Sequence, residues 1–577
     1  MSEIDKIQKK LDKKYGGKVK ASFDGNCIRL TGELDTWADI CKAGQMSVSK
    51  DKRNIHVVND IALKGAEPVK MKVPSLKDDA IDGRKPDVLV IGGGISGCAI
   101  ARELSKWNLD ILLVEKEPDF ALAASGRNDG EVHVGVDLSK GSLKQKYVLL
   151  GNRMYDEVCK ELDVPFRRIG QYACFTQSYL RPVIEALVAY RRFHDGVTDA
   201  RVVGKKKLLS ENPTFNKDFK FAMYNNLAGV VSPYNLTIAY AENAYANGVE
   251  LSTNTAVLSM DVSEGEIHSV TTNRGVVYPK IVVNAAGVFA DEVAEMAGDR
   301  FYSIHPRRGT DSIQDVKSGD IVDTIASVMI INKEALTSHS KGGGIMKTIH
   351  GNVLTGPDAV ECREKEDYST RPDSIKRVYD KQKTTVPLAS EKDIITYFTG
   401  VRAPTYEEDF VIEWGRDCRN LYHVGGIQSP GLTSAPAFAK DVAKAVADRL
   451  SKTMLVTKNA SFNPNRKGIP ELNKMSPSER AKKIAENPDY GVIICRCEEI
   501  SRGEIIDALN SPGCPPTIDG VKKRVRPGMG RCQGGFCSPL VAGIIAEHEG
   551  IPLDEVRKSS DESVLLYGET KGGESVS

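Results

Sequence analysis

Residues 86–97 read PDVLVIGGGISG, an apolar strand followed by three glycines at regular spacing. Gly92, Gly94 and Gly97 form the pattern G-x-G-x-x-G, and the residues that follow, 98–106, favour a helix. Such glycines allow a tight turn, close approach of a pyrophosphate and contact between helix and strand, while the helix N-terminus attracts the phosphates. The stretch therefore predicts a Rossmann-type dinucleotide-binding domain of the α/β class.

A second apolar segment, 110–114, ends at Glu115, where a Rossmann fold places the acid that hydrogen-bonds a ribose. This motif alone does not separate FAD from NAD. Two later segments favour FAD because each is an apolar strand that runs through small residues into a helix. Residues 280–287 read KIVVNAAG, and 420–434 read NLYHVGGIQSPGLTS, with a helix expected from Ala435. The N-terminus of that helix suits a flavin pyrophosphate or the isoalloxazine edge.

These segments and others between them resemble the D-amino-acid-oxidase/glycerol-3-phosphate-dehydrogenase superfamily of FAD enzymes. The matching segments are 92–97, Glu115, 124–135 (ASGRNDGEVHVG), 281–287, 351–357 (GNVLTGP), 399–402 (TGVR) and 425–434. The resemblance implies a Rossmann-type FAD-binding domain interleaved with an α+β substrate domain over residues 86–452. It also implies a set of FAD-binding residues: Gly92, Gly94, Ser96, Gly97, Glu115, Lys116, Ser125, Arg127, Asn128, Val257, Ala286, Gly287, Gly426, Gly431, Leu432 and Thr433.

One arginine and two histidines are the candidate catalytic residues. Arg402 follows the TGV strand and is the expected clamp for a carboxylate or phosphate, because a guanidinium fork matches either anion. A neutral histidine can accept the proton of a substrate hydroxyl or amine near pH 7. His133, in the flavin-lining motif, is the favoured base, unless it only hydrogen-bonds the flavin. His305 is the rival, since the family places its segment over the substrate; Arg307 and Arg308 either add positive charge there or are solvated surface residues.

Four late cysteines have the spacing of an iron–sulfur site. Cys495 and Cys497 form C-x-C, and Cys532 and Cys537 form C-x4-C after 34 intervening residues. Four thiolates in two close pairs suit a [2Fe–2S] cluster, with structural zinc as the alternative. The segment resembles the bacterioferritin-associated-ferredoxin-like domain, and Cys514 lies outside both pairs. The remaining seven of the 12 cysteines are expected to be buried side chains of a reduced protein: Cys27, Cys41, Cys98, Cys159, Cys174, Cys362 and Cys418.

The rest of the chain divides around these two units. Residues 1–65 have an α-β-β-α-β pattern that resembles a BON-type domain, a small α+β fold, and residues 66–85 are expected to be a linker. A second linker or wrapping arm is expected at 453–489, a small iron–sulfur domain at 490–566 and a disordered tail at 567–577.

Overall charge and hydropathy exclude several classes. The formal net charge is +1, from 79 basic and 78 acidic residues, so nucleic-acid binding is not expected. No apolar run reaches the roughly 20 residues of a membrane span, and the N-terminus lacks the apolar core of a secretory signal. We expect a cytoplasmic protein, with peripheral attachment to the inner face of the membrane left open.

A flavin and a one-electron cluster on one chain indicate a two-electron oxidation of a substrate, after which the electrons leave the flavin one at a time. No second complete G-x-G-x-x-G occurs in a suitable context, so electrons are expected to pass to a partner subunit or quinone, in an oligomer or hetero-complex. The combination resembles the catalytic subunits of anaerobic glycerol-3-phosphate dehydrogenases, which implies oxidation of sn-glycerol 3-phosphate to dihydroxyacetone phosphate. The motif at 124–135 is also similar to L-2-hydroxyglutarate dehydrogenases, so another 2-hydroxy acid, or an amino or imino acid, is an alternative. A non-catalytic electron-transfer subunit is the alternative from another class.

Overall fold

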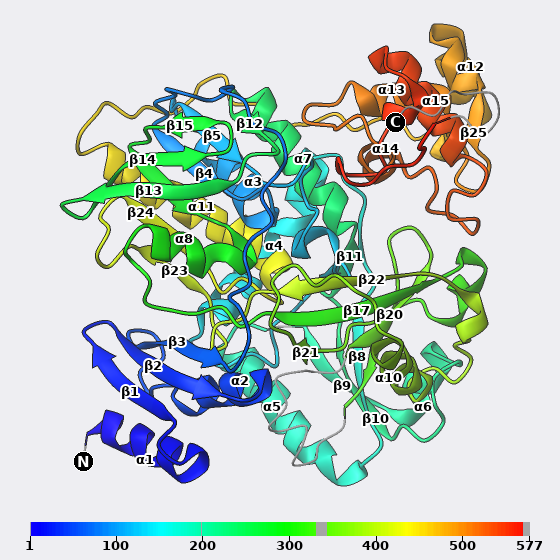
Figure 1. Cartoon of the computed structure of the whole chain (residues 1–577). Helices are drawn as coiled ribbons and strands as arrows, with labels where there is room; N and C mark the ends of the chain where they lie inside the picture. The colour runs from blue at the N-terminus through cyan, green and yellow to red at the C-terminus, as the bar shows by residue number, and fades with distance from the viewer. Residues whose placement is uncertain (1, 198, 330–342, 569–577) are drawn as a thin grey trace.

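The FAD-binding half is built on a six-stranded sheet with the order β12-β5-β4-β16-β24-β23 (Figure 1). The computed structural model describes residues 2–197, 199–329 and 343–568 of the chain. The strands are β12 (Glu250–Ser252), β5 (Ile111–Val114), β4 (Val88–Ile91), β16 (Ile281–Asn284), β24 (Leu421–Gly425) and β23 (Val411–Trp414). All neighbours are parallel except β23 and β24, which are antiparallel. The predicted α/β fold class is confirmed.

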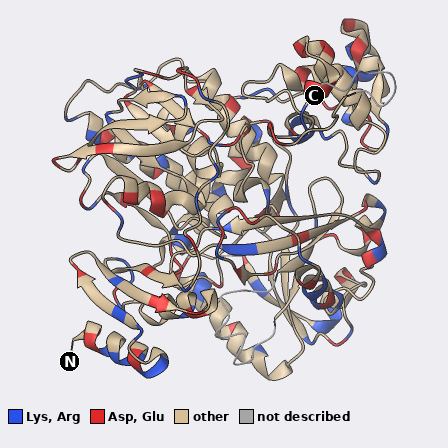
Figure 2. Ribbon diagram, in the orientation of Figure 1, with Lys and Arg blue, Asp and Glu red and all other residues tan. Residues whose placement is uncertain are grey.

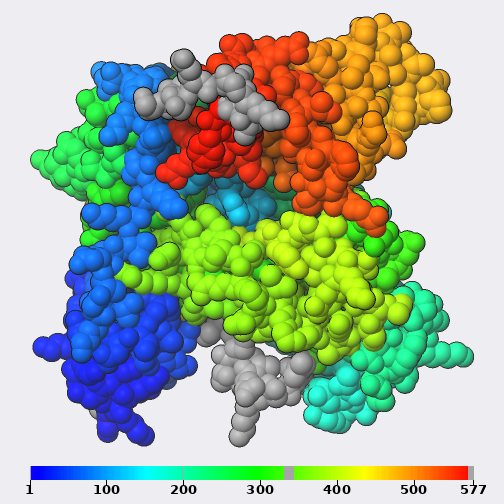
Figure 3. All heavy atoms as spheres, turned by 45° about the vertical axis from the view of Figure 1, so that its right-hand side comes forward, coloured from blue at the N-terminus to red at the C-terminus, as the bar shows by residue number. Residues whose placement is uncertain are grey.

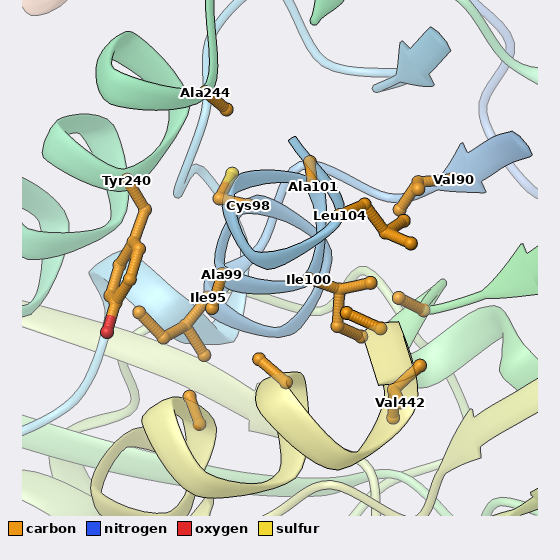
Figure 4. Packing of buried hydrophobic residues seen from close by; sticks show 14 of the residues in the cluster. Val90, Ile95, Cys98, Ala99, Ile100, Ala101, Leu104, Tyr240, Ala244 and Val442 are labelled. Carbon is orange, nitrogen blue, oxygen red and sulfur yellow. The ribbon is translucent and has the colours of Figure 1, made fainter. Parts of the chain in front are cut away.

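Both faces of this sheet are covered, because successive side chains of a strand point in opposite directions. Val88 and Val90 face a core formed with four helices: α3 (Ile95–Leu104), α4 (Leu143–Glu161), α7 (Pro233–Ala246) and α11 (Gly431–Leu450). In Figure 4, α3 lies between Tyr240 and Ala244 of α7, Val442 of α11 and Val90 of the sheet. Leu89 and Ile91 face the opposite core, which contains α8 (Ala290–Met296) and a sheet of β13 (Val257–Ser263), β14 (Glu266–Thr272) and β15 (Gly275–Val277).

Two helices begin earlier than the sequence suggested. Helix α3 begins at Ile95 rather than at residue 98, because Gly94 is its N-cap and the last three residues of the glycine motif are already helical. Helix α11 begins at Gly431 rather than at Ala435 and includes Pro436 in its second turn. In both cases the glycine-rich turn is shorter than expected, which brings the helix N-terminus closer to the strand end.

The substrate half is a nine-stranded sheet among the described residues. Its strands are β21 (Val360–Glu361), β17 (Arg307–Gln314), β20 (Val353–Gly356), β19 (Gly344–Lys347), β18 (Ile325–Val328), β8 (Gln171–Phe175), β10 (Phe221–Asn225) and β9 (Ala200–Gly204), with β22 (Ile394–Arg402) paired to β17. Helices α5 (Arg181–His194), α6 (Lys205–Glu211) and α10 (Pro372–Lys383) lie around it. A small sheet of β6 (Glu131–Val132), β11 (Gly229–Val231) and β7 (Phe166–Arg168) lies next to the two halves.

The N-terminal domain has the predicted element order. It contains α1 (Glu3–Tyr15), β1 (Val19–Asp24), β2 (Cys27–Leu34), α2 (Trp37–Met46) and β3 (His56–Leu63). Strands β1 and β2 form an antiparallel hairpin, and β3 adds in parallel to β2. The domain lies against the catalytic body at the lower left of Figure 1, where Arg416 donates hydrogen bonds to the carbonyl oxygens of Asn26 and Asn54.

Residues 66–85 are not a loose linker. Ile81 is buried against Val270 and Val277 of the small sheet, and its backbone N–H donates to the Arg274 carbonyl at 3.1 Å. The segment runs along one edge of the molecule, in blue in Figure 3, from the N-terminal domain to the opposite end. The polar composition of this segment did not indicate the packing, because a single buried isoleucine makes the apolar contact.

The iron–sulfur domain begins before residue 490. Helix α12 (Pro477–Glu486) starts with a capping box between Ser476 and Glu479, and the N–H of Leu472 donates to Glu504 inside the domain at 3.1 Å. The rest of the domain contains β25 (Ile493–Cys495), β26 (Ile500–Ser501), α13 (Arg502–Leu509), α14 (Ile518–Val525) and α15 (Ser538–Glu549). The expected linker is therefore a wrapping arm up to about residue 470, followed by part of the domain. Residues 569–577 of the predicted tail lie outside the described residues.

A buried ion pair holds the iron–sulfur domain on the FAD-binding half. Arg524 of α14 donates two hydrogen bonds to Asp119, at 3.0 and 3.1 Å, and both side chains are 2% exposed. This bidentate geometry is the favourable one for an arginine–carboxylate pair away from water. Elsewhere basic and acidic residues are interspersed along the ribbon of the chain (Figure 2), as the net charge implies. Among the described residues, none of the helices combines the length and apolar character needed to cross a bilayer.

Candidate active site

A cavity of about 1220 Å³ lies between the Rossmann sheet and the nine-stranded sheet. Strand ends and glycine turns of the FAD-binding half form one wall. The opposite wall consists of alternate residues of the large sheet, which share one face because the side-chain period of a strand is two. They are Gln171 and Ala173 of β8, Met223 and Asn225 of β10, Gly309 and Asp311 of β17, and Gly400 and Arg402 of β22.

Most of the predicted FAD-binding residues line this cavity. They are Gly92, Gly94, Ser96, Glu115, Lys116, Ser125, Arg127, Asn128, Val257, Ala286, Gly287, Gly431 and Leu432. Gly97, Gly426 and Thr433 do not line it but lie behind its wall. The Thr433 hydroxyl, for example, accepts a hydrogen bond from the backbone N–H of His133 at 2.9 Å. Thr433 thus acts on the site through its side chain, which fixes the backbone of His133.

The phosphate-binding turn has the geometry that a dinucleotide requires. Gly92 has φ of +109°, and a Cβ atom on Gly97 would lie 1.9 Å from the Gly92 carbonyl oxygen. Both positions therefore need glycine, the first for its backbone conformation and the second for helix–strand contact. Gly94 is the N-cap of α3 and has no side chain to cap the helix, which leaves backbone N–H groups of its first turn for an anion.

Glu115 lies at the far side of the turn. Its carboxylate accepts hydrogen bonds from the backbone N–H groups of Gly93, at 2.5 Å, and Glu117, at 2.8 Å. Burial raises the pKa of Glu115 to about 7, against the opposing effect of these N–H groups. The residues present thus fit FAD: a glycine turn and a helix N-terminus for the pyrophosphate, and an oriented acid for a ribose.

Substitution of Gly97 tests this fit. We expect Gly97→Ala to be purified with less than a tenth of the wild-type flavin, because the new methyl group would force the helix away from Gly92. The flavin absorbance of the purified protein measures the effect. Gly543→Ala is the matched control, since Gly543 is also helical and its Cβ would meet no atom within 4 Å. Normal flavin content in Gly97→Ala would contradict the assignment of this turn.

Arg402 reaches the cavity from the large sheet. Its Nη2 atom donates to the Asp358 carbonyl at 2.5 Å, and its guanidinium lies against Gly309, where a Cβ atom would be 2.0 Å from Nη2. Burial lowers the pKa of Arg402, while the carboxylates of Asp311 and Asp129 oppose this effect. The group therefore stays cationic. It is placed to bind an anion inside the cavity.

His133 lies on the facing wall, between two oriented side chains. Its Nδ1 atom is 3.0 Å from the Glu131 carboxylate, and its Nε2 atom is 3.2 Å from the hydroxyl of Ser429. Gln171 donates to the same Glu131 oxygen at 2.7 Å. A carboxylate at Nδ1 favours the tautomer that leaves Nε2 unprotonated, which is the arrangement of a histidine base.

His305 is not brought to the cavity. Its Nδ1 atom is 2.8 Å from Glu361, its Nε2 atom is 3.2 Å from the Thr405 carbonyl, and its ring stacks on Tyr406. Both nitrogens are thus engaged within the protein, and the side chain is 1% exposed. Arg307 is paired with Glu361 and Glu408, so the predicted positive charge of this segment is neutralised. Arg308 is likewise paired, with Asp367 at 3.0 Å.

Three side chains of the cavity were missed in the sequence. Glu131 stands two residues before His133 in the quoted motif, and an acidic residue this close to a candidate histidine base could have been recognised. Asp311 and Lys144 carried no such signal, because their place at the cavity depends on strand pairing and on the start of α4. Among the described residues, neither oxygen of the buried Asp311 carboxyl group has a hydrogen-bond partner, and burial raises the pKa of this group well above its ordinary range.

The four predicted ligand cysteines come together at one end of the iron–sulfur domain. The sulfur atoms of Cys497 and Cys532 are 3.7 Å apart, and the Cys537 thiol contacts Cys495. Cys495 and Cys537 are buried, whereas Cys497 is exposed. A Cβ atom on Gly530 would lie 2.4 Å from the Cys497 Cβ, so the loop needs glycine there to close around the thiols. Cys514 lies apart and donates to the carbonyl of Pro515.

Backbone N–H groups surround one of these thiols. Burial opposes ionisation of Cys532, but hydrogen bonds from the backbone of Phe536 and Gly534 outweigh it and lower the pKa of the thiol. A set of four thiols with N–H groups directed at sulfur is the donor set of a [2Fe–2S] cluster. The seven scattered cysteines are all buried, as expected.

A short chain of contacts connects the cavity wall to the cysteine loop. Gly126 follows Ser125 of the wall and lies against Tyr234, whose hydroxyl donates to the Met529 sulfur at 3.4 Å. Arg526 donates to the same hydroxyl at 2.9 Å and forms an ion pair with Glu498, next to Cys497. The iron–sulfur domain is therefore packed directly against the flavin-lining segment.

Comparison with known proteins agrees with this geometry. Residues 87–445 match the model of the FAD dependent oxidoreductase family, and residues 493–547 match that of the BFD-like [2Fe-2S] binding domain. The chain belongs to the FAD-dependent oxidoreductase family. FAD and a [2Fe–2S] cluster, both predicted from the sequence, are thus confirmed at the level of the two domain families.

Three relatives show how far the similarity extends. The chain is 36% identical to a glycerol 3-phosphate dehydrogenase of Caloramator mitchellensis over 84% of its own length and 99% of the relative's. It is 25% identical to the anaerobic glycerol-3-phosphate dehydrogenase subunit A1 of Haloferax volcanii, over 85% and 87% of the two chains. The FAD-bound L-alpha-glycerophosphate oxidase of Mycoplasma pneumoniae superposes with a TM-score of 0.60 at 26% identity, over 66% of this chain and 98% of that one.

Proposed function

We propose that this FAD-dependent oxidoreductase oxidises sn-glycerol 3-phosphate to dihydroxyacetone phosphate and passes the electrons on through its [2Fe–2S] cluster. The observation that carries the proposal is one cavity with a half-buried arginine on one wall and a carboxylate-oriented histidine on the other. The names of the relatives support the same substrate.

Arg402 and His133 have separate roles in the proposed reaction. The Arg402 guanidinium binds the phosphate, since its fork matches two phosphate oxygens. The Nε2 atom of His133 accepts the proton of the C2 hydroxyl, while Glu131 stabilises the resulting imidazolium. A bound FAD would supply the acceptor for the C2 hydride, and a [2Fe–2S] cluster held by Cys495, Cys497, Cys532 and Cys537 would supply one-electron transfer out of the site. The sum is the loss of a hydride and a proton from a secondary alcohol, which yields the ketone.

The acceptor we propose is a partner subunit or quinone at the cytoplasmic face of the membrane, reached from the exposed side of the cluster. The exposed Cys497 supports this direction, because the FAD-binding half covers the other side of the domain. We also propose that the N-terminal domain is related to BON-type domains, on the basis of its element order.

Anaerobic reduction of the purified protein tests the function. Glycerol 3-phosphate should bleach the flavin absorbance and give the EPR signal of a reduced cluster, whereas L-2-hydroxyglutarate and amino acids should leave both unchanged. Bleaching by a 2-hydroxy acid alone would select that alternative. If no small anion reduces the flavin although dithionite does, the protein is an electron-transfer subunit and the proposed dehydrogenase activity is wrong.

Substitution of His133 tests the base. We expect His133→Asn to lower kcat by about 10²–10⁴-fold with little change in KM, because general base catalysis contributes this much while the anion clamp is unchanged. Anaerobic steady-state turnover with an artificial electron acceptor gives both constants. Flavin content and the dithionite-reduced spectrum should stay normal. A kcat within a few-fold of wild type would assign His133 to flavin binding instead.

A further inference from the structure

The segment 405–409 lies between the N-terminal domain and the cavity, and its side chains contact both. Tyr406 and Glu407 bind the N-terminal domain, whereas Glu408 and Asp409 bind residues of the cavity wall. The N-terminal domain lies outside the region that matches the FAD dependent oxidoreductase family, because that match begins at residue 87. A role for it must therefore come from its contacts.

Tyr406 belongs to the hydrophobic core of the N-terminal domain. Its ring packs with Ile40, Ala43 and Val57 and is 5% exposed, and its hydroxyl accepts a hydrogen bond from Asn59 at 2.8 Å. A Cβ atom on Gly44 would lie 2.3 Å from the ring, so α2 needs glycine to receive it. The small domain thus completes its core with a residue of the catalytic body.

Glu407 is held by the same domain. Its carboxylate accepts a hydrogen bond from the backbone N–H of Val57 at 2.9 Å and lies 3.2 Å from His56 Nδ1. Glu407 is 3% exposed. A buried carboxylate is costly unless it is hydrogen-bonded, so loss of these contacts would displace the segment.

The next two residues act on the cavity. Glu408 accepts hydrogen bonds from Arg307 at 2.7 Å and Gln428 at 2.6 Å and lies 3.8 Å from the Lys144 ammonium. Burial opposes its ionisation, but Arg307 and Lys144 lower the pKa of Glu408 to about 2. The carboxylate of Asp409 accepts from the backbone N–H groups of Leu143 and Lys144, both at 3.0 Å, at the start of α4.

Both the backbone and the side chain of Lys144 are consequently held by this segment. Its backbone is held by Asp409 and its ammonium group lies next to Glu408, and it lines the cavity together with Glu407, Glu408 and Asp409. Lys52 of the N-terminal domain lines the same cavity. Lys144 and Lys52 line the cavity that also contains Arg402, so both cations would increase the affinity for a phosphate-bearing substrate.

We propose that the N-terminal domain is a functional part of the substrate site. It holds residues 405–409 so that Lys144 is positioned at the cavity, and it contributes Lys52 as a further cation. The inference rests on the proposed function only in taking the substrate to be anionic. Asn59 and Gly44 are then positioning residues that lie outside the cavity.

Four variants of the full-length protein test the inference. Asn59→Ala loosens Tyr406 and Lys52→Glu reverses the charge; we expect each to raise KM for glycerol 3-phosphate about 5- to 20-fold, with kcat within twofold. Lys52→Arg should keep the wild-type KM. Asp60→Asn is the matched control, because Asp60 adjoins Asn59 and pairs with Arg300 across the same border without touching 405–409. Its KM should be unchanged.

The outcomes separate this inference from the proposed function. If glycerol 3-phosphate reduces the wild-type protein but the KM of both Asn59→Ala and Lys52→Glu equals that of the wild type, the inference is wrong and the proposed function stands. Equal increases in Asn59→Ala and Asp60→Asn would also overturn it, since they would indicate a general effect of domain docking. A wild-type protein that only another anion reduces refutes the substrate, and the same KM series is then measured with that anion.

Discussion

Replacing Arg402 with alanine is expected to lower kcat/KM for glycerol 3-phosphate by about 10²–10³-fold, the usual cost of removing one partner of a buried charge pair. Most of the loss should appear in KM, because the guanidinium binds the phosphate in the ground state as well as during the reaction. Anaerobic steady-state turnover with an artificial electron acceptor, at varied substrate concentration, measures both constants.

The lysine variant sharpens this prediction. Arg402→Lys keeps the charge but loses the planar fork that lies against Gly309, so we expect it to recover only a small part of the affinity. Arg371→Ala is the control, because Arg371 is an exposed arginine paired with Asp367 on the surface. Flavin content should be normal in all three variants. If Arg402→Ala bound substrate normally, another cation of the cavity would have to be the clamp, and Lys144 would be the next to test.

Replacing Cys532 with serine should abolish the iron–sulfur cluster. A hydroxyl is a poor ligand for iron compared with a thiolate, and this thiol is the one whose pKa the surrounding N–H groups lower. The purified variant should lack the cluster's visible absorbance and the EPR signal after reduction. Its flavin should still be bleached by substrate, while turnover with a one-electron acceptor that reacts at the cluster should fall more than tenfold.

Cys514→Ser is the matched control for the cluster. Cys514 lies in the same domain but donates to Pro515 and contacts none of the four thiols. Its iron content should equal that of the wild type. Loss of iron in Cys514→Ser, or stoichiometric zinc in place of iron in the wild type, would contradict the assignment of the four ligands.

Local sequence patterns identified most of the predicted FAD-binding residues that line the cavity and the four cysteines that come together. Gly92, Gly97 and Glu115 could be recognised because each acts through its own backbone or a neighbour close in sequence. The cysteine pairs could be recognised for the same reason, since the ligand spacing of a cluster is set by short loops. The helix starts at Ile95 and Gly431 were missed because a glycine can be the N-cap or the first residue of a helix.

The choice between the two histidines needed the tertiary structure. His133 and His305 are both next to family motifs, but only His133 lines the cavity, while Glu361 and Tyr406 enclose His305. The pairing of β17 with β22 brings Asp311 and Arg402 to one cavity wall, and no local pattern encodes that register. The same holds for the contact between Asp119 and Arg524, which lie far apart in the chain.

The amino-acid sequence by itself determined the two cofactor sites and the α/β class, because phosphate turns, strand–helix units and cysteine pairs are short-range structures. Only the tertiary structure decided which histidine and which cations line the cavity, and that the N-terminal domain reaches the cavity wall through Tyr406 and Glu407. The physical reason is that these contacts join residues hundreds of positions apart. Their geometry follows from how the sheets and domains pack, and the spacing of residues along the chain does not determine it.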